Sequence, residues 1–213
     1  MKTTVPRFLN FYLFLILVLC FIILSFIVDQ YILKNSTIIS LYKDNLNSEQ
    51  LNKMLIIKQK WKFIGYSLIP VRYLLIICFV LLCLKIGIFF ENIKIDNSLI
   101  IRALILSEFV FVVQKVIHVI YLTKFGVTDI FDVQYFVPFS ILIFYKNSLL
   151  TYGVKYVLSS LNLFELGFWI ILAFFLRKLL NMNFFKSFLF VSKTYGLGIL
   201  LWFIVILFLD TII

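Results

Sequence analysis

The sequence predicts an all-α membrane protein, a polytopic bundle of about five transmembrane helices that forms a single domain over residues 1–213. The chain is 63% hydrophobic and 14% charged, whereas a soluble domain is nearer ~45–50% apolar and ~25% charged. The segment from Phe8 to Val28 contains no charged residue, and about 20 helical residues cross the ~30 Å hydrocarbon core of a bilayer. Several further segments approach that length, so lipid rather than water is predicted to surround most of the chain.

The first predicted span is interpreted as a retained helix. It is long for the apolar region of a signal peptide, and no A-x-A-like cleavage site follows it. We expect the five spans at Phe8–Val28, Tyr66–Phe90, Leu99–Tyr121, Tyr156–Leu176 and Leu189–Leu209.

A polar stretch with many lysines separates the first two spans. Within it, Ser48 is a candidate N-cap for a helix over residues 48–61, in which Leu51 and Leu55 share an apolar side. This pattern is typical of an amphipathic helix at the membrane interface. A solvated loop helix is the alternative interpretation.

The segment over residues 130–145 is apolar but short, and it holds Pro138 near its middle. Segments of this length are often re-entrant or interfacial. If it does not cross, five spans with a cytoplasmic N-terminus place Arg177, Lys178 and Lys186 inside, which agrees with the positive-inside rule. If it crosses, the N-terminus lies outside and the six lysines between residues 34 and 62 lie inside. We favour the five-span arrangement.

The net charge of +10 is interpreted as lysines and arginines that flank the spans and contact anionic headgroups. No nucleic-acid partner is predicted. The three cysteines Cys20, Cys78 and Cys83 lie inside apolar segments and form no CxxC pair, so they are interpreted as packing residues. His118 is the one histidine of the chain, and a zinc site needs three or four ligands. No metal or cofactor is predicted.

Ionisable residues at membrane depth are the candidates for function. Arg72, Lys85 and Arg102 lie near span ends, from where long side chains reach the headgroups. Glu108 is different, because it lies near the middle of its span and its side chain is short. Lys115 follows Glu108 by two helical turns and shares its face, and His118 lies further around the same helix.

A second polar stripe is predicted on the fourth span, where Ser159, Asn162 and Glu165 recur at every third residue. We expect the polar sides of spans three and four to face each other, with Lys193 of span five as a partner of Glu165. The candidate intramembrane site is therefore the set Glu108, Lys115, His118, Asn162, Glu165 and Lys193.

Three roles remain open for this polar set. It can hold the helices together, it can form a proton or ion pathway, or it can line a groove for a substrate or partner. An enzymatic alternative rests on Cys83, Arg102 and His118, which follow the chain order of the Cys, Arg and His of exosortase-type membrane cysteine transpeptidases. Cys83 lies in an apolar LLCLKIG context that makes a thiol inert, so this alternative is the least favoured.

A family resemblance is carried by LNLFELGFWIILAFFL, by FVSKTYGLGILLWFIVILFL, and by the KQKWKFIGYSLIP and QYFVPFSIL segments before them. In these segments the chain resembles bacterial Yip1-like membrane proteins. The resemblance covers residues 58–209, and it implies an all-helical bundle of about five spans without enzymatic activity or catalytic residues. Eukaryotic relatives act in membrane trafficking through partner proteins.

We therefore predict a non-enzymatic accessory or assembly protein of the bacterial cytoplasmic membrane, which acts through a larger membrane protein or complex. A small proton- or ion-coupled transporter that uses the intramembrane Glu, Lys and His residues is the alternative.

Overall fold

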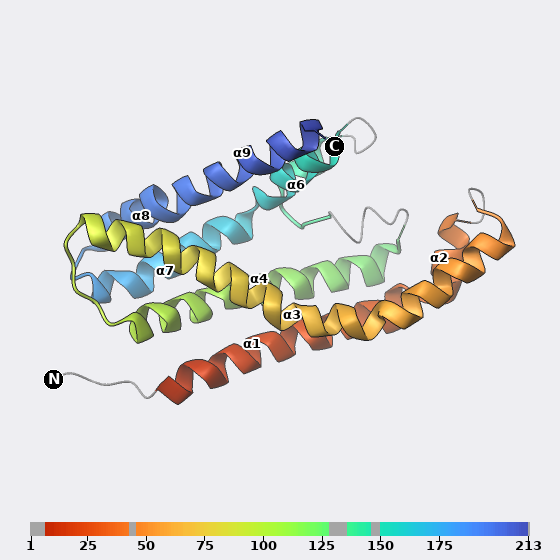
Figure 1. The fold of residues 1–213 in the computed structure, drawn as a ribbon, viewed down its shortest axis with the longest axis horizontal. Helices are drawn as coiled ribbons and strands as arrows, with labels where there is room; N and C mark the ends of the chain where they lie inside the picture. Colours follow the sequence, from red (N-terminus) through yellow and green to blue (C-terminus); the bar gives the residue numbers. More distant parts are fainter. Residues whose placement is uncertain (1–6, 43–45, 128–135, 146–149, 213) are drawn as a thin grey trace.

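The computed structural model describes residues 7–42, 46–127, 136–145 and 150–212, and it shows a bundle of long helices (Figure 1). Within those ranges every regular element is helical, which confirms the predicted all-α class. The elements are α1 (Arg7–Ile27), η1 (Val28–Ile32), α2 (Asn35–Tyr42), α3 (Ser48–Phe90), α4 (Asn97–Phe125), η2 (Ile141–Phe144), α6 (Tyr152–Ser160), α7 (Leu163–Leu179), α8 (Phe184–Val191), η4 (Ser192–Gly196) and α9 (Leu197–Ile212).

Four helical stretches are long and apolar enough to cross a membrane. They are Phe8–Ile32, Ser48–Phe90, Asn97–Phe125 and Phe184–Ile212, and they contain the first, second, third and fifth predicted spans. The chain is thus a membrane helical protein.

The predicted span at residues 156–176 is wrong in its start and its continuity. The structure divides this region into α6 and α7, with a break at Leu161 and Asn162. The break arises because the Asn162 side chain accepts a hydrogen bond of 2.9 Å from the backbone N–H of Glu165 and so begins a new helix. α7 has 17 residues, which corresponds to about 26 Å. Figure 1 shows α7 running alongside the other long helices, so it forms a further pass of the bundle.

Successive passes run in alternate directions, and α1 begins at the end of the bundle opposite to the end where α9 finishes (Figure 1). The described part of the 130–145 segment does not cross. Ile141 donates a backbone hydrogen bond of 3.0 Å to Leu161, and Leu163 donates one of 3.3 Å to Phe139. Residues 136–145 therefore lie against the break between α6 and α7, where they satisfy backbone groups that the interrupted helix leaves open. Residues 130–135 lie outside the described part.

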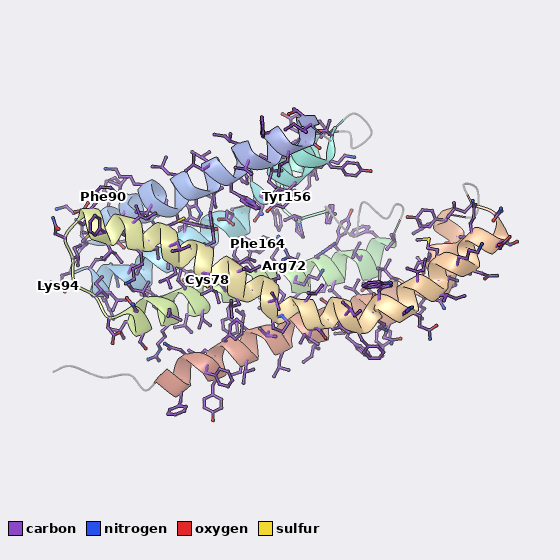
Figure 2. All side chains as sticks on the ribbon, in the orientation of Figure 1. Arg72, Cys78, Phe90, Lys94, Tyr156 and Phe164 are labelled. Atoms are coloured by element: carbon purple, nitrogen blue, oxygen red, sulfur yellow. The ribbon has the colours of Figure 1, made fainter. Side chains whose placement is uncertain are left out.

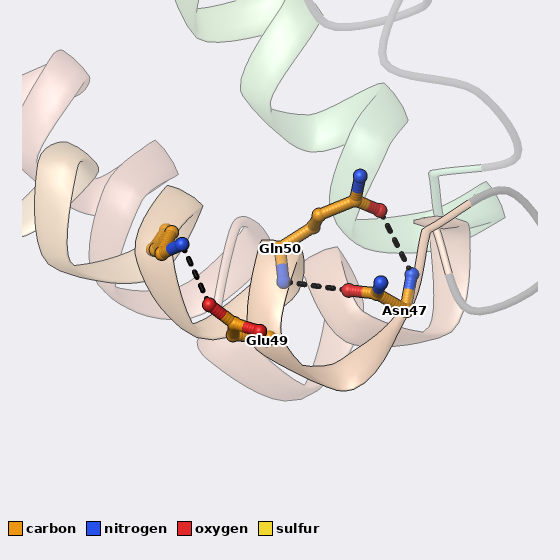
Figure 3. A network of polar contacts seen from close by, with 4 residues as sticks. Asn47, Glu49 and Gln50 are labelled. Carbon is orange, nitrogen blue, oxygen red and sulfur yellow. Dashed lines mark hydrogen bonds and ion pairs between the residues drawn. The ribbon is translucent and has the colours of Figure 1, made fainter.

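The predicted interfacial helix and the second span form one continuous helix. α3 has 43 residues, which corresponds to about 64 Å, roughly twice the thickness of the hydrocarbon core. It begins with a capping box (Figure 3). The backbone N–H of Gln50 donates a hydrogen bond of 2.9 Å to the side-chain oxygen of Asn47, and the backbone N–H of Asn47 donates one of 3.1 Å to the side-chain oxygen of Gln50. Glu49 and Lys53 add an ion pair of 2.6 Å in the same turn. The N-cap is therefore Asn47, and the prediction of Ser48 was one residue late.

The first part of α3 forms an arm that projects beyond the bundle together with α2 (Figure 1). At the base of the arm, the Tyr66 hydroxyl donates a hydrogen bond of 2.6 Å to Asp29 of η1. Lys58 donates one of 2.6 Å to the carbonyl of Leu33. These contacts tie the arm to the end of the first pass.

The core lies where α4 packs between α1 and α7. Asn10 of α1 donates hydrogen bonds of 2.8 and 3.0 Å to the carbonyl and hydroxyl of Ser98 at the start of α4. The Ser187 hydroxyl of α8 donates 2.8 Å to the carbonyl of Ala173 in α7. Fully buried aliphatic and aromatic side chains fill the space between these helices, including Leu17, Leu84, Ile100, Leu104, Phe168, Leu172 and Leu176.

Candidate functional site

The candidate site is a cluster of buried polar side chains at the contact of α4 and α7. Glu108 of α4 is 1% exposed, and its Oε2 atom has no hydrogen-bond partner in the part of the chain that the structure describes. The neighbouring Ser107 is also fully buried, and its hydroxyl donates 2.8 Å to the carbonyl of Ala103 one turn earlier. Glu108 therefore lies inside the bundle, as the spacing along the third span predicts.

Glu165 supplies the second carboxyl group of the cluster. Its place in the first turn of α7 follows from the Asn162 cap. The indole N–H of Trp169 donates a hydrogen bond of 2.9 Å to Glu165 Oε1, and the Tyr195 hydroxyl of η4 approaches the same carboxyl group. The N-cap and first turns of α7, together with Tyr195 of η4, thus position this side chain.

The fold brings the two glutamates together. Glu165 is the acidic neighbour whose charge acts on Glu108, and Arg72 of α3 is the cation that acts on it. Aromatic rings pack around Tyr195. Phe168 packs against Phe111 at 5.5 Å and against Tyr195 at 5.3 Å between ring centroids.

Tyr195 was missed as a member of the site, and the charge of Arg72, an exposed side chain of α3, was not expected to act on it. Arg72 was expected to reach the headgroups because the second span was predicted to begin at Tyr66. In the structure, α3 begins at Ser48, well before Tyr66. The short separation between Tyr66 and Arg72 therefore does not show how far Arg72 lies from the membrane surface. Figure 2 shows Arg72 part-way along α3, and its charge acts on both Glu108 and Lys115. For Tyr195, the available signal was a tyrosine hydroxyl within an otherwise apolar span.

Two other predicted members lie along α4. Lys115 is half-buried and follows Glu108 by two turns. His118 is 7% exposed, and its ring lies 5.9 Å from that of Phe136. Ten residues separate His118 from Glu108, which corresponds to about 15 Å along the helix. His118 is thus a neighbour of the 136–145 segment rather than of the carboxyl pair.

The predicted roles of Asn162 and Lys193 are corrected. Asn162 is the N-cap of α7, and its amide donates 3.0 Å to the carbonyls of Ser159 and Ser160, so the three-residue stripe does not lie on one helix. Lys193 is exposed and lines a groove between α3 and the last pass. It forms no ion pair with Glu165, whose carboxyl group is held by Trp169 instead.

The cysteine and histidine of the enzymatic alternative are not brought together. Lys85 of α3 donates a hydrogen bond to the side chain of Asn97 at the start of α4. This contact shows that Lys85 and Asn97 lie at the same height along the axis of the two antiparallel helices. From this level, Cys83 and His118 are separated by roughly 28 Å along the bundle axis. A base at that distance does not reach the thiol. Within residues 7–42, 46–127, 136–145 and 150–212, no group of three His, Cys, Asp or Glu side chains has a metal-binding arrangement.

Comparison of the chain with protein-family models, with curated proteins and with solved structures finds no match. The resemblance to Yip1-like proteins therefore stays a prediction from the sequence.

Proposed function

We propose that the protein is a non-enzymatic accessory or assembly component of a bacterial cytoplasmic membrane, and that it binds a helix of a larger membrane protein along the outer side of α3. The single observation that carries the proposal is a line of exposed apolar side chains on that helix. Its members are Ile57, Trp61, Ile64, Leu68, Val71, Leu75, Cys78 and Leu82, which we call the α3 seam.

The spacing of the α3 seam favours a helical partner. Its residues alternate in steps of four and three, which is the heptad pattern that keeps one side of a helix facing another helix. The exposed fractions range from 46% at Ile64 to 64% at Leu82, and Cys78 is also exposed. The seam is therefore continuous, and no other helix in the part of the chain that the structure describes covers it.

The length of the α3 seam argues against lipid as its complete cover. From Ile57 to Leu82 the seam extends over about 38 Å, which exceeds the ~30 Å hydrocarbon core. Its first part lies on the arm, among Lys53, Lys60 and other polar residues. Exposed apolar side chains beyond the core of the bilayer are typical of a surface that binds protein.

The burial of Glu108 supports the same proposal. Its side chain is 1% exposed, so it faces neighbouring helices of the bundle.

The proposal is tested by co-purification of the tagged protein from its native membrane in mild detergent. We expect a stoichiometric membrane partner that is lost from the Ile57→Glu/Trp61→Glu variant. The matched control is Ile56→Glu/Phe63→Glu, which places the same charges on exposed apolar positions of the arm outside the seam. The control should keep the partner. Recovery of the free monomer from all three proteins would contradict the proposal.

A small proton- or ion-coupled transporter is the second candidate, because the charges of Glu165 and of the exposed Arg72 both act on the buried Glu108. This function predicts a pH-dependent flux in proteoliposomes that Glu108→Gln and Glu165→Gln each abolish. Ser107→Ala is the control, since it changes a buried hydroxyl beside Glu108 and leaves both carboxyl groups in place. Flux that is absent from the wild type, or that is unchanged in both glutamine variants, would remove this candidate.

A further inference from the structure

A groove of about 1050 Å³ runs between α3 and the last pass of the bundle, on the outer surface of the protein. Its long walls are apolar and include Ile86 of α3 and Leu201, Trp202 and Val205 of α9. These side chains are between 45% and 65% exposed, so they face whatever surrounds the bundle. The walls follow the helix axes and therefore run in the direction of lipid acyl chains.

The polar lining of the groove is basic. Asn181, Asn183, Lys186 and a single acidic residue, Glu91, line one end, and Lys193 follows Lys186 by about 10 Å along the last pass. Two positive side chains against one negative leave a net charge of +1 in this lining. Both lysines are exposed, and neither has a partner that would neutralise it within the described residues.

This end of the groove lies where a headgroup would meet the bundle. Two turns lie at this end, one between α3 and α4 and one between α7 and α8. In Figure 2 the labels of Phe90 and Lys94 mark this end of the bundle. Lys94 and Lys178 are exposed on the same turns but do not line the groove. The groove thus combines long apolar walls with a positive site beside the turns that join the helices.

We propose that the groove binds an anionic glycerophospholipid, with one acyl chain between α3 and α9 and the phosphate at Lys186 and Lys193. Basic pockets between transmembrane helices are known to hold anionic headgroups. A partner helix would need acidic side chains at matching positions to neutralise the two lysines. A lipid phosphate carries the negative charge itself and can contact both ammonium groups. The charge complementarity therefore favours a lipid as the occupant.

The test is native mass spectrometry of the purified protein with phosphatidylglycerol or phosphatidylcholine of identical acyl chains. We expect tighter retention of phosphatidylglycerol, with a loss of about fivefold for each lysine removed from the site. The Lys186→Gln/Lys193→Gln variant should retain both lipids equally. The control, Lys94→Gln/Lys178→Gln, removes the same charge at the same end and should keep the preference.

A second measurement locates the lipid. In a protein whose remaining tryptophan is Trp202, through Trp61→Phe and Trp169→Phe, phosphatidylglycerol with brominated acyl chains should quench the fluorescence more strongly than brominated phosphatidylcholine. The first measurement keeps all tryptophans, so it decides the question even where Trp169→Phe perturbs the fold. Equal retention of the two lipids by the wild type, an unchanged preference after loss of both groove lysines, or a dimer in place of the lipid adducts would overturn the proposal.

Discussion

Gly87 of α3 lies against Thr194 of η4 so closely that a methyl group on Gly87 would overlap the Thr194 side chain. The same methyl group would come within 2.9 Å of the Phe190 ring. Nearby, Gly198 of α9 faces Cys83 of α3 in the same way. Small residues at these two positions let the second and last passes approach each other, as small residues do in membrane helix pairs generally.

Gly87→Ala should therefore lower the free energy of unfolding by about 1–3 kcal/mol, as expected for an overpacked contact. Gly65→Ala is the control, because nothing lies within 4 Å of its added methyl group, and alanine should stabilise the exposed helix slightly. Thr194→Ser removes the overlapping methyl group and keeps the hydroxyl that donates to Phe190. It should restore part of the loss in the double variant. Thermal unfolding in detergent measures all four proteins, and equal stability of the two alanine variants would contradict the close contact.

Glu108→Met should leave the fold intact and raise the free energy of unfolding by about 1 kcal/mol. The reason is that it removes a buried oxygen that has no hydrogen-bond partner among the described residues. Trp169→Phe should instead lower it, because the Glu165 carboxyl group would lose the indole N–H at 2.9 Å. Chemical denaturation in detergent compares the two changes. A loss of several kcal/mol in Glu108→Met would show that Glu108 has a stabilising partner.

Tyr66→Phe should loosen the arm from the bundle. The change removes the hydroxyl that donates 2.6 Å to Asp29, a contribution of about 1 kcal/mol. Amide hydrogen exchange should then accelerate in η1 and in the adjoining part of α3, and remain unchanged in α7. Tyr12→Phe, at a 60% exposed position of α1, is the control. Identical exchange in both variants would mean that the arm is held by other contacts.

Asn47→Ala should fray the first turns of α3 at a cost of about 1 kcal/mol, whereas Ser48→Ala should have little effect. Asn47 holds the capping hydrogen bond with Gln50, and Ser48 is already the first helical residue. Asn47→Ser should preserve most of the cap. Amide exchange of Leu51 and its neighbours reports the difference. The opposite order of effects would place the cap at Ser48.

Hydrophobic length predicted most of the fold, since four of the predicted spans lie within the long apolar helices. It did not predict where helices join or break. Gly65 and Pro70 lie between Ser48 and Phe90, and each could end a helix. The structure accommodates both within α3, so the helix continues through them. In contrast, Asn162 ends one helix and caps the next within an apolar region, which hydropathy alone does not reveal.

The site was predictable where helical periodicity is regular. Glu108 lies inside the bundle, as its helical spacing predicts, and the charge of Glu165 acts on it. The position of Lys193 was not predicted correctly. The π-helical turn η4 over Ser192–Gly196 inserts an additional residue into the helix, which changes the side that Lys193 faces. This turn presents Tyr195 to Glu165 and leaves Lys193 on the outside. Contacts of this kind depend on tertiary structure.

The most direct test of the account is photo-crosslinking from two adjacent positions of the arm in the native membrane. Ile64 belongs to the α3 seam and is 46% exposed, whereas Phe63 lies off the seam and is 77% exposed. A photoreactive residue at Ile64 should give a protein adduct of one defined mass, and the same residue at Phe63 should give none. Protein adducts of equal yield from both positions, or lipid adducts alone from Ile64, would contradict a partner helix on α3.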